Sequence, residues 1–202
     1  MLVLLMACLA EPAAQAAEGM TLKGSESRIF ALVYKAGAAS SVAHDHVIHA
    51  TGASGSLVFD PSRGDTLGIK VSVPASGLSP DEDAMRTLVG LPDLLTPTQR
   101  DEVKSHLLGE SQLAGDRFPT LSFQSTSVVV EDKTFLVTGD FSLRGVTQSI
   151  TVPLKVAPTE EGARVKGRFS VLQSDYGYAP YSALLGALSV KDEVEVVVDL
   201  TF

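Results

Sequence analysis

The chain has 202 residues, of which 45% are hydrophobic and 20% are charged, and its formal net charge at pH 7 is −8. This length and apolar content suffice for one domain with its own core, without help from a disulfide or a structural metal. The acidic balance and the lack of a basic cluster argue against nucleic acid, and against an anionic membrane surface, as partners.

The first sixteen residues are typical of a secretory signal. Residues 2–9 form a short apolar run, and residues 14–16 (Ala-Gln-Ala) match a signal-peptidase cleavage pattern. We therefore predict a signal peptide over residues 1–16 and a single periplasmic domain over residues 17–202. The apolar run is too short to span a bilayer, so the protein is not expected to be membrane-spanning. A lipoprotein acylated at Cys8 is the less favoured alternative.

The first half of the mature domain predicts four strands, over residues 28–35, 41–51, 54–60 and 67–73. The first of these is apolar on both faces. One face, which we expect to point inward, carries Phe30, Leu32 and Tyr34. The other face would form a dimer patch on the outside and carries Ile29, Ala31 and Val33.

Residues 80–108 change to helical periodicity and predict a small helical insertion. Pro80 is followed by three acidic residues, which favours a helix that begins at the proline. A second helix start lies at the Thr-Pro pair of residues 96–97. The insertion should therefore contain two short helices.

Residues 118–156 contain three segments of alternating apolar residues, joined by short polar or glycine-containing connectors. This pattern is typical of an antiparallel meander with one apolar face. Further strands over residues 164–172 and 190–202 bring the total to eight or nine. A one-sided sheet of this size must close or be covered. We therefore predict an all-β fold with a small helical insertion, in which an antiparallel sheet of eight or nine strands closes into a barrel.

Several short motifs resemble those of the YceI-like family of exported lipid- and polyisoprenoid-binding proteins, in the same order and spacing. Residues 117–123 (Arg-Phe-Pro-Thr-Leu-Ser-Phe) and 139–147 (Gly-Asp-Phe-Ser-Leu-Arg-Gly-Val-Thr) carry most of the likeness, supported by residues 55–60 and 175–177. The resemblance extends over residues 27–202. It implies a lipocalin-like barrel whose apolar channel holds the tail of an isoprenoid lipid, with no enzymatic activity and no cofactor.

The resemblance and the strand parities together predict the residues that line this channel. They are Phe30, Leu32, Tyr34, Val42, Leu57, Phe59, Ile69, Val71, Leu121, Phe123, Phe141, Leu143, Val152, Phe169 and Val171. Gly139 and Gly167 also have inward parity, where they would either leave room along the axis or mark a bulge or bend. The competing interpretation is a dry barrel that these side chains simply fill.

Three histidines lie close together at the second predicted strand. His44 and His46 share parity with Val42 and would face the lumen, whereas His49 would face the other way. Three interpretations stay open: a metal site, a polar mouth that binds a ligand head group, or histidines anchored by Asp45 and backbone carbonyls. Two further residues are candidates for the head-group site at the mouth, Arg86 on the first helix and Tyr176 in the loop after residue 172.

We predict a periplasmic binding or carrier protein that holds a long apolar ligand, of the polyisoprenoid type, in a barrel channel. The first alternative is a metal-binding module or metal-dependent enzyme that uses His44 and His46. The second is a ligand-free barrel that binds a partner or a second copy of itself. The sequence contains no catalytic triad spacing, phosphate-binding loop or paired carboxylates that we would assign to catalysis, so no catalytic residue is predicted.

Overall fold

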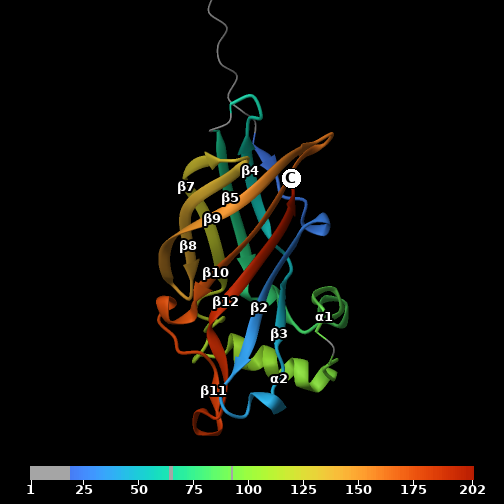
Figure 1. The fold of residues 1–202 in the computed structure, drawn as a ribbon, viewed down its shortest axis with the longest axis vertical. Helices are drawn as coiled ribbons and strands as arrows, with labels where there is room; N and C mark the ends of the chain where they lie inside the picture. Colours follow the sequence, from blue (N-terminus) through green and yellow to red (C-terminus); the bar gives the residue numbers. More distant parts are fainter. Residues whose placement is uncertain (1–18, 64–65, 92) are drawn as a thin grey trace, which may run out of the picture.

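A computed structural model describes residues 19–63, 66–91 and 93–202. Within these ranges the chain forms one antiparallel sheet that wraps into an elongated barrel, with two helices beside its lower half (Figure 1). None of the helices in the described residues is both long and apolar enough to cross a membrane. The predicted signal peptide and the alternative acylation site at Cys8 lie outside the described residues.

The strands are β1 (Met20–Thr21), β2 (Arg28–Ala36), β3 (His46–Ala50), β4 (Ser54–Phe59), β5 (Leu67–Pro74), β6 (Leu78–Pro80), β7 (Thr120–Glu131), β8 (Thr134–Leu143), β9 (Val146–Thr159), β10 (Gly162–Leu172), β11 (Ser182–Ala183) and β12 (Leu188–Thr201). The α-helices are α1 (Asp83–Val89) and α2 (Pro97–Leu108). Short 3-10 turns are η1 (Gly24–Glu26), η2 (Ser40–Val42), η3 (Ala75–Gly77), η4 (Gln173–Tyr176) and η5 (Leu184–Gly186). The predicted meander corresponds to β7, β8 and β9, which pair in sequence order.

The twelve strands of the described chain exceed the eight or nine predicted, because three strands of only two or three residues, β1, β6 and β11, were not predicted. Residues 51–53 separate β3 from β4, and η3 separates β5 from β6. The hairpin nevertheless continues across both breaks, since the Thr51 N–H donates to the Gly77 carbonyl at 2.9 Å. β1 and β11 have only two residues each. The fold class is confirmed: the sheet is antiparallel throughout and has eight principal strands.

β2 and β1 close the barrel. β2 pairs with β12 on one side and with β3 on the other, which joins the last long strand to the first hairpin. Ahead of β2 in the chain, β1 pairs with β4. Lys23, which follows β1, donates its backbone N–H to the Thr201 carbonyl of β12 at 2.8 Å. The closed sheet leaves few unpaired strand edges exposed to other chains.

The interior of the barrel has two different ends. At the end where β4, the β9–β10 hairpin and the C-terminus meet, the inward side chains pack into a continuous apolar cluster, which we call the packed core (Figure 1). Its most deeply buried members are Leu57, Val137, Ala163, Val165, Leu200 and Phe202. Toward α2 the inward side chains surround a cavity instead.

α1 covers the outer face of β2 and β3. Phe30 and Leu32 of β2 pack there with Val47 of β3 and Met85 of α1. Each of these four side chains is at most 9% exposed. The outer surface of β2 is therefore a second, smaller hydrophobic core.

The predicted parity of β2 is consequently wrong. Ile29, Ala31 and Val33 point inward and line the cavity, so they do not form the predicted dimer patch on the outside. The error has a physical reason: a strand that is covered on both faces is apolar on both faces, and alternation then cannot distinguish inside from outside.

The two helices begin differently from one another. α2 begins at the predicted Thr-Pro pair, where the Thr96 hydroxyl accepts the Gln99 N–H at 3.3 Å and the Gln99 side chain accepts the Thr96 N–H at 2.9 Å. α1 does not begin at Pro80, because that residue ends β6 and is paired with Ile48. Asp81 follows with a left-handed φ of 55°, and the helix starts only at Asp83.

Gly139 and Gly167 make room for neighbouring side chains rather than for a ligand. A Cβ atom on Gly139 would lie 2.5 Å from the ring of Phe123, and one on Gly167 would lie 2.5 Å from a methyl of Leu154. A register shift between Ser125 and Ser127, opposite Gly139, also marks a bulge there. The glycines thus serve close packing at a bent part of the barrel wall.

We expect Gly139→Ala to destabilise the protein by about 1–3 kcal/mol, because both the Phe123 ring and the Gln124 carbonyl would have to move. Gly68→Ala in β5 is the matched control, since its Cβ would meet no atom nearer than 3.8 Å. Urea unfolding of both variants measures the difference. Equal stabilities of the two variants would contradict the packing role of Gly139.

Candidate ligand-binding cavity

Between the packed core and α2, the barrel encloses a cavity of about 190 Å³. Its lining comes from β2, β3, β5–β10 and β12, and Leu107 of α2 and Leu113 border it from outside the sheet. A single buried water needs only about 10–15 Å³ of such space. The cavity is therefore large enough for a chain of many non-hydrogen atoms.

The cavity lining is almost entirely apolar. Among the described residues that line it, only Ser122, Gln173 and Tyr178 carry a polar side-chain group, and none is charged. The Gln173 amide donates to the Lys191 carbonyl at 2.8 Å, so its N–H bond is already made within the protein. Because an ionised ligand group would lose its hydration here without a partner, the lining fits an apolar chain.

Ten of the fifteen predicted channel residues border this cavity, although the Phe30 side chain packs on the other face of β2, under α1. They are Phe30, Ile69, Val71, Leu121, Phe123, Phe141, Leu143, Val152, Phe169 and Val171. Nine of them belong to β5 and β7–β10, where one face of each strand is clearly apolar and the parity is easy to assign.

The other five predicted channel residues lie elsewhere. Leu57 and Phe59 pack in or against the packed core, which closes that end of the barrel. Leu32 and Tyr34 belong to the cluster under α1. Val42 is 76% exposed, because residues 40–42 form the turn η2 and not the start of a strand.

Sequence reasoning missed several lining residues on β2, β3 and β12 and in the segments around α2. They include Ile29, Ala31 and Val33 of β2, Ala50 of β3, Leu107, Leu113, Tyr178, and Val194, Val196 and Val198 of β12. The shared apolar face of β12 was visible as a pattern of alternate valines. Nothing in the sequence indicated which face of β2 or which side of α2 meets the barrel.

Tyr176 does not lie at the mouth of the cavity. Its side chain is 1% exposed and packs edge-on against Phe141, with ring centres 5.6 Å apart. Burial raises the pKa of Tyr176 to about 12, and its hydroxyl has no hydrogen-bond partner among the described residues. Tyr178 lines the cavity instead, and burial raises its pKa as well.

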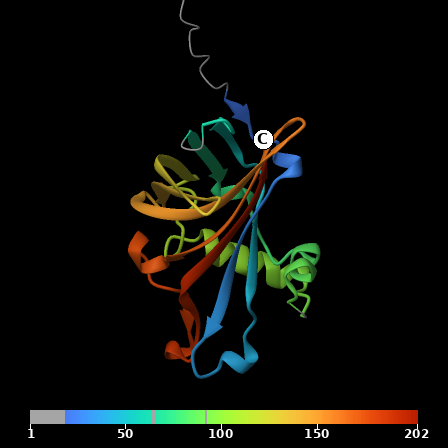
Figure 2. The same ribbon diagram turned by 45° about the horizontal axis from the view of Figure 1, so that its top comes forward.

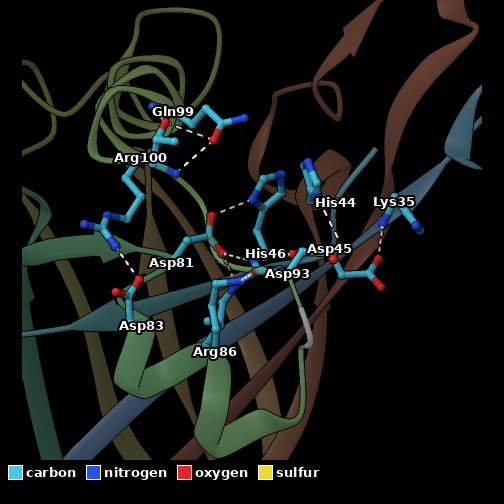
Figure 3. Close-up of polar contacts among 12 residues, drawn as sticks. Lys35, His44, Asp45, His46, Asp81, Asp83, Arg86, Asp93, Gln99 and Arg100 are labelled. Carbon is cyan, nitrogen blue, oxygen red and sulfur yellow. Dashed lines mark hydrogen bonds and ion pairs between the residues drawn. The ribbon is translucent and has the colours of Figure 1, made fainter. Parts of the chain in front are cut away.

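Beside the barrel, Asp81 is the centre of a buried polar network (Figure 3). Its carboxylate accepts hydrogen bonds from Arg86 Nη1 at 2.7 Å and from the Val47 N–H at 3.1 Å, and it contacts His46 Nδ1 at 2.6 Å. Asp81 is 0% exposed and Arg86 is 1% exposed. The network joins β3 to α1 through Asp81, which lies in the link between β6 and α1.

Arg86 is a structural tie and not a head-group ligand at the mouth. Besides Asp81, its Nη1 donates to the Asp45 carbonyl at 2.8 Å, and its Nε donates to the Asp93 carbonyl. The guanidinium therefore holds three chain segments together. A buried arginine with these partners is not available to a ligand in the barrel.

The three histidines pair with three different carboxylates. His46 contacts Asp81, His49 Nδ1 lies 2.7 Å from Glu82, and His44 Nδ1 lies 3.7 Å from Asp93. Nowhere in the described part of the chain are three or more His, Cys, Asp or Glu side chains grouped to hold a metal ion. Neither His44 nor His46 lines the cavity.

The partners of Asp81 outweigh the cost of its burial. Burial by itself raises the pKa of a carboxyl group, but the hydrogen bond and charge of His46, the Val47 N–H and Arg86 together hold the pKa of Asp81 below its usual value. The carboxylate is therefore the favoured form, and it contributes to stability as long as it is ionised.

The chain was compared with families and proteins already known. The model of the YceI-like domain family matches residues 21–202. No curated protein matches the chain significantly.

Two of the solved structures that it resembles come from different bacteria. BcnA of Burkholderia cenocepacia is 16% identical and has a TM-score of 0.66, with 89% of this chain and 98% of that chain covered. The Campylobacter jejuni YceI protein that crystallises with large solvent channels is 14% identical, with a TM-score of 0.55 and coverage of 75% and 81%. At these identities the likeness shows a common fold.

We expect Arg86→Met to lower the free energy of unfolding by about 3–5 kcal/mol, because it leaves the Asp81 carboxylate buried without its arginine partner. Arg100→Met is the control: Arg100 pairs with Asp83 at 2.5 Å, but Asp83 is 60% exposed. Losing such a pair should cost less than about 1 kcal/mol. Chemical denaturation that finds similar losses for both variants would show that Arg86 is no structural tie.

The lowered pKa of Asp81 predicts a specific dependence of stability on pH. The stabilisation by Asp81 is fully present above the pKa of the unfolded chain, about 3.9, and is lost as the pH falls through the lower folded value. Between about pH 5 and pH 2, the melting temperature of the native protein should therefore fall more steeply than that of Asp81→Asn. Parallel curves for the two proteins would rule out this contribution.

Proposed function

The chain belongs to the YceI-like family, and from this membership and the cavity we propose that it binds a long apolar ligand of the polyisoprenoid type and carries it through the periplasm. The single observation that carries the proposal is the uncharged cavity inside a closed barrel. Members of the family bind polyisoprenoid-type ligands in such a barrel and are exported to the periplasm. The proposal includes no catalytic step.

Apolar burial supplies the binding energy in this proposal. Each methylene group that leaves water contributes about 0.8 kcal/mol, from which the cost of ordering the ligand is subtracted. An isoprenoid tail is branched and unsaturated, and the phenylalanines of the lining present flat faces and edges to it. Phe141 and Phe169 lie edge to face with ring centres 6.2 Å apart, which fixes the shape of the wall they form.

The packed core gives the proposed ligand a direction. Because Leu57, Leu200 and their neighbours close one end of the barrel, the apolar tail would point toward them and the head group toward α2. At that end, the Arg144 guanidinium lies 5.7 Å from the ring centre of Tyr178, which lines the cavity. A positive charge next to the lining would suit a head group that carries a phosphate.

Organic-solvent extraction of the untagged protein, followed by mass spectrometry, tests the proposal. We expect an isoprenoid lipid in an amount comparable with that of the protein. Ala31→Phe should reduce this load strongly, because its ring would project from β2 into the cavity. It should leave the melting temperature unchanged or higher, since the added ring fills existing space.

Ala157→Phe is the matched control, because Ala157 is exposed on β9 and should keep the full lipid load. Ala50→Phe, on β3, offers a second variant that fills the cavity. A native protein without bound lipid would overturn the proposal, as would cavity-filling variants that retain the native load.

A further inference from the structure

The end of the molecule remote from the packed core is an apolar tip, which we define as residues 37–43 and 182–188. The two segments lie side by side at the bottom of Figures 1 and 2, and the Ala39 N–H donates to the Ala187 carbonyl at 2.8 Å. Val42 is 76% exposed and Leu184 69%, while Leu185 is fully exposed. Large apolar side chains therefore project into solvent at one place.

The tip is also free of charge. Residues 36–43 and 177–190 contain no Asp, Glu, Lys or Arg, although 20% of the whole chain is charged. The net negative charge of the protein thus resides on other surfaces. An apolar medium could receive the tip without stripping water from an ion.

The backbone holds the two leucines outward at a cost. Leu184 and Leu185 have φ values of 51° and 55°, which is the left-handed region that side chains other than glycine and asparagine avoid. Their side chains bury little or no surface within the chain, so packing inside the protein does not compensate for this strain. Contact with an apolar partner would account for it.

Two lysines lie directly behind the tip. Lys35 is opposite Val190, and its Nζ donates to the Ala43 carbonyl at 2.9 Å. Lys191 Nζ lies 5.4 Å from the ring centre of Tyr34. Proteins that insert at a membrane interface often place leucines at the inserted end and lysines next to them, on the side of the protein body. The lysines then lie at the level of the lipid phosphates.

Two carboxylates near these lysines are already engaged within the protein. Asp45 accepts the Lys35 backbone N–H at 2.8 Å, and Asp192 accepts the Ser174 hydroxyl at 2.6 Å. Both lie behind the tip and not on it. They therefore do not place a negative charge where the leucines would meet lipid.

We propose that the apolar tip docks reversibly into the surface of a phospholipid bilayer. β2 and β12 line the cavity through Val33 and Val194 and continue into the tip, so docking would turn the cavity end near α2 toward the lipid. The overall acidity argued against an anionic membrane surface, but here apolar insertion and not net charge drives the contact. This inference does not depend on the identity, or the presence, of a ligand in the cavity.

Flotation with vesicles of phosphatidylethanolamine and phosphatidylglycerol tests the proposal. The double variant Leu184→Asn, Leu185→Asn removes the apolar side chains, and asparagine accepts a left-handed backbone. Since burial of one leucine changes partitioning by about tenfold or more, we expect the bound fraction at low lipid to fall at least about tenfold. The melting temperature should stay the same or rise, because the strain at both positions is relieved.

Val129→Asn is the matched control: Val129 is 58% exposed on β7, its neighbour Val128 packs against the packed core at the other end of the barrel, and its loss should leave flotation unchanged. Failure of the native protein to float, or equal flotation of the native protein and the double variant, would overturn the proposal. Sedimentation that shows a native dimer, dissociated by the double variant, would also overturn it and assign the tip to self-association.

Discussion

β2 is the strand on which the rest of the structure depends, because both of its faces are apolar and each needs its own cover. Ile29, Ala31 and Val33 face the barrel interior, so β2 must close the sheet between β12 and β3. Phe30 and Leu32 face outward and require α1. α1 in turn is fixed by the Asp81–Arg86 ion pair. The polar residues that suggested a metal site or a head-group site therefore hold α1 in place over the outer face of β2.

Much of the barrel could be predicted from the sequence, because β7, β8 and β9 each have one apolar face and short connectors. Where a strand is covered on both sides, as β2 is, alternation loses its meaning and the predicted parity was reversed. Residues 41 and 42 were assigned to a strand, but they belong to the turn η2, and the small side chains around them provide no alternation to support a strand. Glycines raise a similar difficulty: Gly139 has inward parity, yet the Phe123 ring fills the space beside it.

The cavity lining likewise divides into residues that strand patterns could predict and residues that they could not. Strands of the meander supply lining residues that could be predicted, whereas the part of the cavity near α2 depends on how a helix and two distant strands meet. The partner of His46 is Asp81, which lies 35 positions away along the chain and follows a strand end. Local spacing of histidines cannot reveal a buried carboxylate of that kind. The spacing of the histidines therefore suggested a metal site or a head-group site at the cavity mouth, whereas the structure has the network of His46, Asp81 and Arg86 there.

The account joins a barrel that is packed at one end to a cavity and an uncharged tip at the other. Its central claim is that the cavity is a binding site and not a defect in packing. A crystal structure of the protein purified from its native cells tests this most directly. The account expects elongated non-protein density from Val152 and Leu200 toward Tyr178. Side chains of Phe123, Phe141 and Phe169 that meet and close the cavity, with no such density, would contradict it.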